Sequence, residues 1–564
     1  MTKTVADTLV NVLEQIGLKQ IFALIGDSLN PLADAVRSSS IEWIGVRHEE
    51  GAALAASGQA KLTGRLAVCA GTTGPGSTHL VAGLYEAARD HAPVLALSGN
   101  MPRKMQGIDY FQTTKPDLLF RDVSLYTETI MSAEQAPAVI HQAIAAAYAG
   151  RGVAHLTLPQ DVLSARSDSG VASVDTLQPR PEIVASGEDV AGIASRIDAA
   201  GSVLIMCGNG CHGAAAELRA LSDRLKAPLI HSVKGQDILP YDDPHWMGGI
   251  GFIGSKPVYN AVMSADLLLM VGTDYPYSNF LPNRPVVVQI DERPEVLGRR
   301  APTALGVLGS ARPTLKLLID QVAPKTATSY WDRLTEERRA WDRKLDQQAD
   351  LARSADHIHP QAVARAVSDL ANRDAVFVLD TGLNTLWSAN WIRQSGSQRI
   401  IGSFNNGAVG TALGQANGIQ AVDRARQVIA LTGDGGFNML MCEFLTAIHH
   451  KLPVKTVIYN NAAFGLIRLE AESIGVPPYR QGIDFPNPDF AAFARACGGH
   501  GFAARKPDEL KNAISEALAV DGPAIVDAAV VANELPNLPH LDLELLGQVA
   551  RAKVKEAVLA ITGS

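Results

Sequence analysis

The feature that most constrains the fold is an alternation, repeated along most of the 564 residues, of short β-branched runs with longer segments of helical periodicity. This alternation is typical of parallel strands that are joined and covered by helices. Three blocks can be separated, with predicted boundaries at residues 1–165, 188–324 and 355–532, followed by a tail at residues 533–564. We therefore predict an α/β protein with three doubly wound parallel-sheet domains.

The stretches between the blocks differ from them in composition. Residues 164–182 are polar and contain proline, which predicts a linker. Residues 325–354 are rich in Arg, Glu, Asp and Lys, which predicts a solvated connecting helix.

The first and third blocks resemble each other. Each contains a strand, a glycine turn, a helix and a proline that leads into a second strand. Gly71 precedes Pro93 by 22 positions, and Gly433 precedes Pro453 by 20. All α/β units share this pattern to some degree, so the match by itself only favours two related domains on either side of a different middle domain.

Charge and cysteine content exclude several classes of protein. Lys and Arg number 50 against 58 Asp and Glu, a net charge of −8, so no excess of cations favours nucleic-acid binding. No apolar run reaches the roughly 20 residues that cross a bilayer. Asp7 and Glu14 interrupt the segment where a signal peptide would be apolar. Five scattered cysteines do not form a disulfide framework, so we expect a cytoplasmic protein.

The most specific motif is Gly433-Asp434-Gly435, followed after 24 residues by Asn460-Asn461. Residues 427–431 and 454–459 predict strands, and residues 437–451 predict one amphipathic helix between them. Asp434 and Asn461 would then lie at the carboxyl ends of neighbouring strands, where parallel sheets bind ligands. A carboxylate, an amide oxygen and backbone carbonyls suit Mg²⁺. Unrelated Asp-Gly and Asn-Asn turns are the plainer alternative, but the spacing and context favour a metal site.

This motif resembles the magnesium-diphosphate motif of thiamin diphosphate (ThDP) enzymes. The resemblance extends over nearly the whole chain to the pyruvate oxidase family, chiefly to its bacterial pyruvate dehydrogenase (quinone) type. Matching stretches include IGDSLN, VRHEEGAALAASGQAKLTG, AVCAGTTGPGSTHL, MCGNGC, IGSFNNG and GDGGFNMLM. The resemblance implies pyrimidine-binding, central FAD-binding and diphosphate-binding domains in that order. It also implies a homotetramer with active sites across dimer interfaces.

The resemblance assigns the ThDP-binding residues by position. Glu49 looks like the glutamate that shares a proton with N1′ of the aminopyrimidine, a task that needs a buried carboxyl; Glu50 is the competing choice, and a solvated acid at a helix start is the plainer one. The metal ligands implied are Asp434, Asn461 and the carbonyl of Ala463, beside Gly433, Gly435 and Gly436. Gly407 and Val409 resemble the residues that contact and bend the cofactor, although relatives usually carry a larger side chain at the Val409 position.

Residues expected near the substrate follow from the same resemblance. Phe111 and Gln112 match a pair that faces the substrate, and Ile467 and Glu470 match residues over the reacting centre. Glu470 would relay protons, whereas plain core packing explains Ile467 equally well.

The middle block separates a flavoenzyme from a non-redox decarboxylase. Residues 206–213 follow a predicted strand and are expected to open a helix whose amides receive a diphosphate. Asp291 ends another predicted strand, where it would meet a nucleotide hydroxyl or cap a helix. By resemblance to FAD-binding segments, the candidates are Gly208, Lys234, Gly251, Gly272, Asp274, Asp291 and Arg293.

These observations predict oxidative decarboxylation of pyruvate to acetate and CO₂ with ThDP, Mg²⁺ and FAD, the electrons passing to a quinone or another acceptor. The alternative is an acetolactate-synthase-like carboligase, or a non-oxidative 2-oxo acid decarboxylase, with structural FAD. Leu466 favours that alternative, since related oxidases carry Phe or Trp there. A non-catalytic scaffold is a third interpretation, which Glu49, Asp434 and Asn461 disfavour. The short tail predicts at most peripheral contact with the inner face of the cell membrane.

Overall fold

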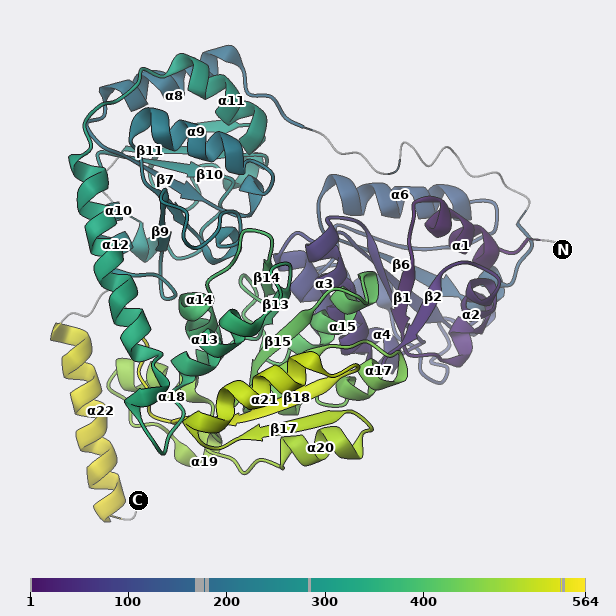
Figure 1. Ribbon diagram of the computed structural model, residues 1–564. Coiled ribbons are helices and arrows are strands. Elements are labelled where there is room, and N and C mark those ends of the chain that lie inside the picture. Colours follow the sequence, from purple (N-terminus) through teal and green to yellow (C-terminus); the bar gives the residue numbers. More distant parts are fainter. Residues whose placement is uncertain are drawn as a thin grey trace.

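The structure, a computed structural model, describes residues 3–167, 177, 182–281, 286–537, 539 and 543–562. These residues form three six-stranded sheets in which every strand pair is parallel, with helices on the sheet faces (Figure 1). The predicted fold class, α/β with three parallel-sheet domains, is confirmed. Most of the linker predicted at residues 164–182 lies outside the described residues.

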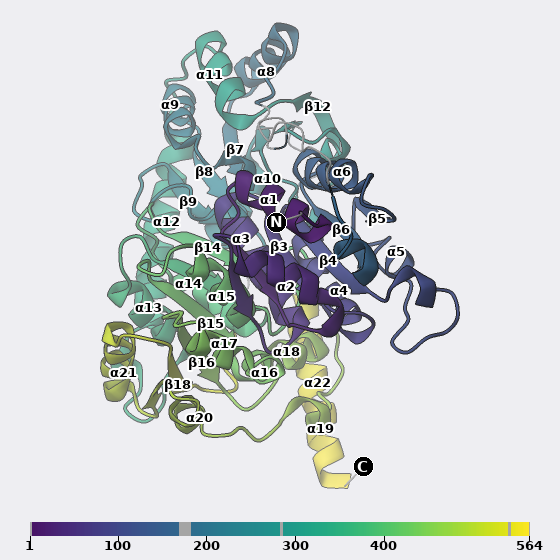
Figure 2. The same ribbon diagram turned by 90° about the vertical axis from the view of Figure 1, so that its right-hand side faces the viewer.

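The N-terminal domain has the strand order β2-β1-β3-β4-β6-β5. Its strands are β1 (Gln20–Ala23), β2 (Glu42–Gly45), β3 (Ala67–Gly71), β4 (Val94–Asn100), β5 (Tyr126–Thr129) and β6 (Val153–Pro159). Its helices are α1 (Val5–Gln15), α2 (Asn30–Arg37), α3 (Glu49–Thr63), α4 (Pro75–Arg89), α5 (Pro116–Leu119), α6 (Ala136–Ala149) and α7 (Gln160–Leu163). Figure 2 shows the segment before α5 projecting from this domain.

The middle domain has the order β12-β11-β10-β7-β8-β9. Its strands are β7 (Val203–Cys207), β8 (Leu229–His231), β9 (Trp246–Gly249), β10 (Leu267–Val271), β11 (Val286–Asp291) and β12 (Thr303–Leu308). Its helices are α8 (Gly187–Ala199), α9 (Ala215–Leu225), α10 (Lys256–Ser264) and α11 (Ala311–Gln321). Cys207 and Cys211 are buried, as expected for small apolar thiols.

The C-terminal domain repeats the N-terminal strand order as β14-β13-β15-β16-β18-β17. Its strands are β13 (Val376–Leu379), β14 (Arg399–Gly402), β15 (Val428–Gly433), β16 (Lys455–Asn460), β17 (His500–Ala504) and β18 (Ala524–Ala529). Its helices are α13 (Pro360–Leu370), α14 (Leu383–Trp391), α15 (Ala412–Val422), α16 (Asp434–Met439), α17 (Glu443–His449), α18 (Gly465–Ser473), α19 (Arg480–Ile483), α20 (Phe490–Ala496) and α21 (Pro507–Ala519). The shared order supports the internal repeat seen in the sequence.

Helices α3 and α15 join the N- and C-terminal domains through one apolar core. Buried residues of both domains, among them Phe22, Ala55 and Ala416, belong to a single cluster. Two glycines allow the close approach: a Cβ on Gly418 would meet the Ala55 carbonyl oxygen at 1.9 Å, and one on Gly58 would meet the Gln415 carbonyl oxygen at 2.5 Å. The two domains therefore pack as one body.

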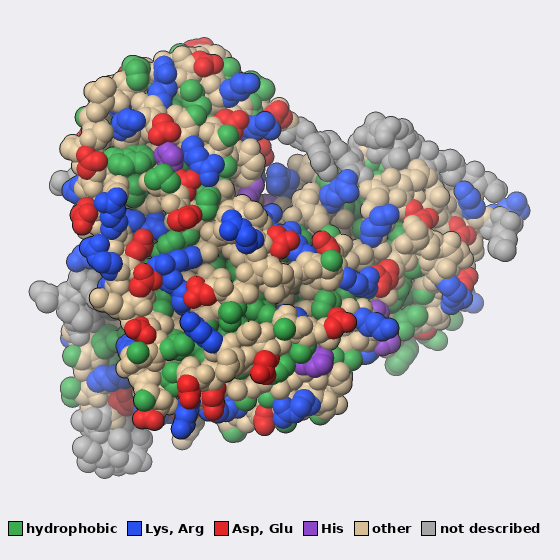
Figure 3. All heavy atoms as spheres, in the orientation of Figure 1, with side chains coloured by type: hydrophobic (Ala, Val, Ile, Leu, Met, Phe, Trp, Pro, Cys, Tyr) green, Lys and Arg blue, Asp and Glu red, His purple; other side chains and the backbone are tan. Residues whose placement is uncertain are grey.

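Two long helices connect and end the chain. The predicted connecting helix is α12 (Ser329–Gln348); Lys and Arg side chains alternate with Asp and Glu along its edge of the molecule (Figure 3). It is not wholly solvated, because Leu334, Arg338 and Leu345 are buried. The tail forms α22 (Leu543–Thr562), which packs against α18. Among the described residues, no helix combines the length and apolar character required to cross a membrane.

Candidate active site

Asp434 is fixed by uncharged donors at the carboxyl end of β15. It is the first residue of α16 and is buried. Its Oδ1 accepts from the Gly435 N–H (2.9 Å), and its Oδ2 accepts from the Ala462 N–H (2.5 Å) and from Asn487 Nδ2 (2.7 Å). Burial raises the pKa of Asp434 despite these hydrogen bonds. No Lys or Arg of the described residues forms an ion pair with it, so its negative charge lacks a compensating cation.

The turn after β16 places further oxygen atoms beside Asp434. Ala462 adopts a left-handed conformation (φ 54°), and its N–H reaches Asp434. Among the described residues, Asn461 Oδ1 accepts only a 3.2 Å bond from the Ala463 N–H, and the Ala463 carbonyl accepts one bond, from the Gly465 N–H (2.9 Å). A carboxylate without a cation, an amide oxygen and a carbonyl with a free lone pair are donors that fit a small hard cation.

The helix after Asp434 differs from the prediction. Residues 437–451 were expected to form one amphipathic helix, but α16 ends at Met439 and α17 begins at Glu443. Leu440 leaves the helical region (φ −132°, ψ 32°), although its side chain stays buried. The apolar spacing continues across the break, so the sequence pattern does not reveal it. The break places Glu443 in the first turn of a new helix.

Glu443 links the C-terminal domain to the start of α3. It is buried, and its Oε1 accepts from the Arg47 N–H (3.1 Å) and the His48 N–H (2.8 Å). Its Oε2 accepts from the Thr446 hydroxyl at 2.7 Å. A Cβ on Gly51 would meet Glu443 Cδ at 2.4 Å, so a glycine is needed there. These bonds fix the backbone just before Glu49.

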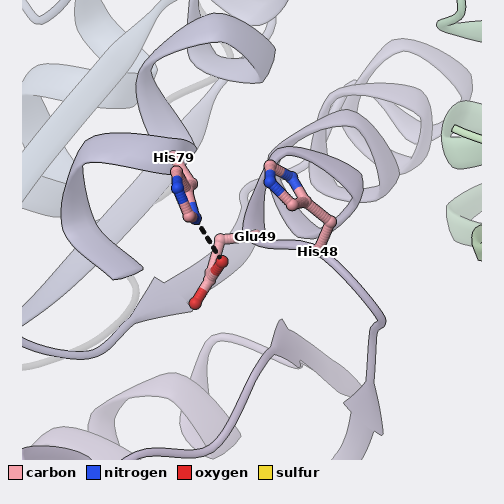
Figure 4. Close-up of side chains that lie close together, drawn as sticks. All are labelled: His48, Glu49 and His79. Atoms are coloured by element: carbon pink, nitrogen blue, oxygen red, sulfur yellow. Dashed lines mark hydrogen bonds and ion pairs between the residues drawn. The ribbon is translucent and has the colours of Figure 1, made fainter. Parts of the chain in front are cut away.

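Glu49 is the first residue of α3 and is buried, as predicted for it. Figure 4 shows its carboxylate directed at His79 of α4, and Glu49 Oε2 lies 2.9 Å from His79 Nδ1. The His79 ring stacks on that of His48, with centroids 4.5 Å apart. A Cβ on Gly76 would meet Glu49 Oε1 at 3.1 Å. The N–H of Glu50 donates to Nδ1 of His48, and His48 thereby caps the start of α3.

The segment between β14 and α15 carries Gly407 and Val409. Gly407 requires a left-handed conformation (φ 69°), and Val409 is 38% exposed. Behind them, the buried Asp380 accepts from the Gly410 N–H (2.9 Å) and the Thr411 N–H (3.1 Å). Burial raises the pKa of Asp380 to about 6. This acid holds the segment against the end of β13.

A cavity of about 770 Å³ lies where the three domains meet. Its wall in the middle domain follows the carboxyl ends of β7, β10 and β11, and its wall in the C-terminal domain includes Gly407, Leu466 and Glu470. Five of the candidates for FAD binding line it: Lys234, Gly272, Asp274, Asp291 and Arg293. The Tyr275 hydroxyl, which belongs to the same wall, is buried without a hydrogen-bond partner in the described residues. The size and the unsatisfied polar group fit an elongated organic ligand.

The charged candidates in this cavity differ from one another. Burial would raise the pKa of Asp274, but Arg299 and Arg300 outweigh it and lower that pKa. Burial does raise the pKa of Asp291, whose Oδ1 accepts only the Arg293 N–H (3.0 Å) in the described residues. No α-helix begins there, so the helix-cap alternative for Asp291 is wrong.

Two glycine candidates act in packing. A Cβ on Gly208 would meet Thr273 Cβ at 2.4 Å, and one on Gly251 (φ 86°) would meet the Tyr275 hydroxyl at 1.8 Å; neither residue lines the cavity. Residues 206–213 lead from a strand toward a helix, as expected, but the helix does not begin within them. A 3₁₀ turn at Asn209–Cys211 follows β7, and α9 begins at Ala215.

Two of the candidates for substrate contact are exposed. Phe111 is 73% exposed on the projecting segment before α5, and Ile467 is 53% exposed on α18. Gln112 has a left-handed backbone (φ 58°) whose carbonyl approaches Gly74. Neither Glu49 nor Asp434 lines the 770 Å³ cavity, which Glu470 does line. Glu49, Phe111 and Asp434 are therefore not among the residues that line this cavity.

Comparison with known proteins agrees with the three-domain arrangement. Three family models match: "Thiamine pyrophosphate enzyme, N-terminal TPP binding domain" at residues 3–119, "central domain" at 190–318 and "C-terminal TPP binding domain" at 380–528. The chain is similar to YdaP of Bacillus subtilis, whose name refers to thiamine pyrophosphate but to no reaction (34% identical over 95% of this chain and 92% of that protein). It is also similar to a pyruvate oxidase of Lactiplantibacillus plantarum (32%, 97% and 92%) and to acetolactate synthase 1 of Oryza sativa (27%, 95% and 86%).

The fold and these matches define a three-domain α/β enzyme with ThDP-binding domains at both ends of the chain. The protein belongs to the thiamine pyrophosphate enzyme family.

Proposed function

We propose that this enzyme decarboxylates pyruvate oxidatively, using ThDP, Mg²⁺ and FAD. Pyruvate and water give acetate, CO₂, two protons and two electrons, and the electrons leave through FAD to a quinone or another acceptor. The observation that carries the proposal is the 770 Å³ cavity, which extends from the strand ends of the middle domain to Gly407 and Glu470. Such a cavity would hold a flavin within reach of the decarboxylation site.

When bound, ThDP would supply the electron sink for loss of CO₂, and FAD would supply the electron acceptor. The chain's own residues bind and orient them. Asp434, Asn461 and the Ala463 carbonyl would hold Mg²⁺ and with it the diphosphate, next to the start of α16. Glu49 would hold a proton at the aminopyrimidine, and its burial keeps water from competing for that proton. Glu470, on the cavity wall, would move protons at the reacting centre.

A second copy of the chain would complete the site. Neither Glu49 nor Asp434 lines the cavity, and the apolar Phe111, Ile108 and Leu118 are exposed on the N-terminal domain. Exposed apolar side chains of this size favour burial in an interface. We therefore propose a homotetramer in which the N-terminal domain of one chain faces the C-terminal domain of its partner.

Leu466 supports a second candidate function. It lines the cavity beside Leu469 and Glu470, where an aromatic ring would stand in related oxidases. An aliphatic side chain there would leave the flavin structural and yield a carboligase that makes acetolactate, or a simple 2-oxo acid decarboxylase. The similarity to acetolactate synthases is compatible with this candidate.

The absorption spectrum of the purified, cofactor-loaded enzyme tests both candidates. Without oxygen, pyruvate should bleach the flavin band, and product analysis should find acetate. A Glu49→Gln variant of equal flavin content is the matched control and should not bleach. A flavin band that persists in the wild type, with acetolactate or acetaldehyde as the product, would reject the oxidase and support the second candidate.

The C-terminal tail is relevant to the electron acceptor and to the cellular location of the enzyme. We propose a cytoplasmic enzyme with at most peripheral membrane contact, because α22 carries only a few basic residues, including Arg551, Lys553 and Lys555. Flotation with anionic vesicles, with and without pyruvate, tests this. Binding that appears only with pyruvate would favour a membrane quinone as the acceptor, and its absence would favour a soluble acceptor.

A further inference from the structure

A buried cluster of two cations and two carboxylates lies where the three domains meet. Lys61 of α3 pairs with Glu86 and with Asp90 (Nζ–Oδ2 2.6 Å), both at the carboxyl end of α4. Lys234 of the middle domain pairs with Asp90 at 2.9 Å. The Glu86 side chain is fully buried, and that of Lys61 nearly so. The four charges cancel, which is the condition for burying them at moderate cost.

The pairing outweighs burial at the centre of the cluster. Burial would lower the pKa of Lys61, but Asp90 and Glu86 raise it. Burial would likewise raise the pKa of Asp90, but Lys234 and Lys61 hold that pKa well below its usual range. Lys61 and Asp90 therefore stay ionised around neutral pH. The charged side chains of this cluster therefore hold one another in fixed positions.

The second oxygen of Glu86 binds the segment that carries Gly407 and Val409. The Ser403 hydroxyl donates to Glu86 Oε2 (2.5 Å), and the same hydroxyl accepts from the Ala408 N–H (2.8 Å). The Ser403 carbonyl accepts from the Gly407 N–H at 3.1 Å. The segment is thereby tied to α4 through one side chain.

Two further bonds tie the end of β14 and the segment after it to the N-terminal domain. Lys61 Nζ donates to the Gly402 carbonyl (3.0 Å), and Asn405 Nδ2 donates to the Arg89 carbonyl (3.2 Å). Phe404 packs against the apolar core of the C-terminal domain, but Val409 is exposed and a Cβ on Gly407 would meet nothing within 4 Å. Toward Gly407, hydrogen bonds rather than apolar contacts therefore hold the segment.

We propose that Glu86 and Ser403 are positioning residues that hold residues 403–408 in the conformation which presents Gly407 and Val409 to the cofactor. Lys61 holds Glu86 in turn, and Lys234 extends the link to the middle domain through Asp90. The part of this inference that concerns the cofactor rests on the ThDP function proposed above. The part that concerns the conformation of the segment does not.

Hydrogen exchange of the protein without added cofactor tests the structural part. A Ser403→Ala variant should raise the exchange rate of peptides that cover residues 404–411 at least tenfold. Ser403→Thr, which keeps the hydroxyl, should restore slow exchange, and Glu86→Gln should raise the rate less than Ser403→Ala. The matched control is Ser388→Ala, a buried serine of the same domain whose hydroxyl contacts Tyr459 (3.2 Å), and it should leave these peptides unchanged. Unchanged exchange in Ser403→Ala would overturn the proposal.

Cofactor titration and kinetics test the functional part. ThDP with Mg²⁺ should bind Ser403→Ala within threefold of the wild-type affinity, because Asp434 and Asn461 are untouched. Its kcat with pyruvate should fall at least tenfold, with KM nearly constant. Faster exchange of the segment with an unchanged kcat would overturn the positioning role. If wild-type protein binds no ThDP, the proposed function fails, while the exchange experiment still decides the structural part.

Discussion

The N- and C-terminal domains share one strand order but use the same position for different chemistry. Strand β15 leads directly into α16, whose first residue is Asp434, and the neighbouring β16 ends at Asn460, followed by Asn461. The equivalent strand β3 ends in a turn with Gly74 and Pro75 and no acid, although its neighbour β4 also ends in an asparagine. The acid of the N-terminal domain, Glu49, comes from α3 instead.

The difference shows how one fold divides the binding of one cofactor. In the C-terminal domain, the oxygen atoms of Asp434 are held by the N–H groups of Gly435 and Ala462 and by the Asn487 side chain. In the N-terminal domain, Glu49 is held by a side chain, His79, and by the helix start that Glu443 fixes. Under the proposed function, the C-terminal domain would anchor the cofactor and the N-terminal domain would hold its proton.

Glu49→Gln is the sharpest test of this division and has the largest expected effect. Gln fills the same space and can still accept from His79, but it cannot share a proton with the aminopyrimidine. Turnover of pyruvate should fall by about 10²–10⁴-fold, while ThDP affinity measured by calorimetry changes only a few fold. Glu50→Gln is the control and should retain activity. If Glu50→Gln were the inactive variant, the wrong glutamate has been assigned.

Asp434→Asn tests the role proposed for the C-terminal domain. The loss of the buried charge should weaken Mg²⁺-dependent ThDP binding by about 10²–10³-fold, since a hard cation depends on a charged oxygen ligand. Titration of ThDP at fixed Mg²⁺ measures this, with removal of Mg²⁺ by EDTA as a parallel condition that should mimic the variant in wild-type protein. Equal ThDP affinity with and without Mg²⁺ would show that no metal anchors the cofactor.

The surroundings of Asp434 and of Glu49 also differ in how far the sequence predicts them. Asp434 and Asn461 end adjacent parallel strands, so local pattern and spacing suffice to bring them together. His79, Glu443 and Asn487 were missed, because their contacts to Glu49, His48 and Asp434 span 30, 395 and 53 positions and no short motif records such pairs. The break at Leu440 escaped prediction since apolar spacing continues through it.

The pH dependence of stability tests the buried acids of the C-terminal domain. Burial raises the pKa of Asp380 from 3.8 to about 6, so the folded state binds this proton more tightly than the unfolded state. The contribution of Asp380 to the free energy of unfolding should therefore fall by at most about 3 kcal/mol as pH rises from about 4 to about 6. Above about pH 6 it should stay constant. Asp380→Asn, which has no proton to lose, should not show this fall.

Urea unfolding of wild type and Asp380→Asn at pH 4.5 and pH 7 measures the difference. The wild type should lose stability relative to the variant as pH rises. A gain of wild-type stability over that interval would mean that the hydrogen bonds from Thr432, Gly410 and Thr411 outweigh burial.

Variants of Glu443 test whether the N-terminal domain depends on its contact with the C-terminal domain. In Glu443→Ala the N–H groups of Arg47 and His48 lose their acceptor, so the free energy of unfolding should fall by about 1–3 kcal/mol. Glu443→Gln keeps an acceptor oxygen for both N–H groups and should cost about 1 kcal/mol or less. Urea unfolding compares them, with the exposed Glu516→Ala of α21 as the control. Equal losses in the Ala and Gln variants would assign the link to the charge of Glu443 rather than to its hydrogen bonds. The helix start before Glu49 would then depend on an ion within the C-terminal domain.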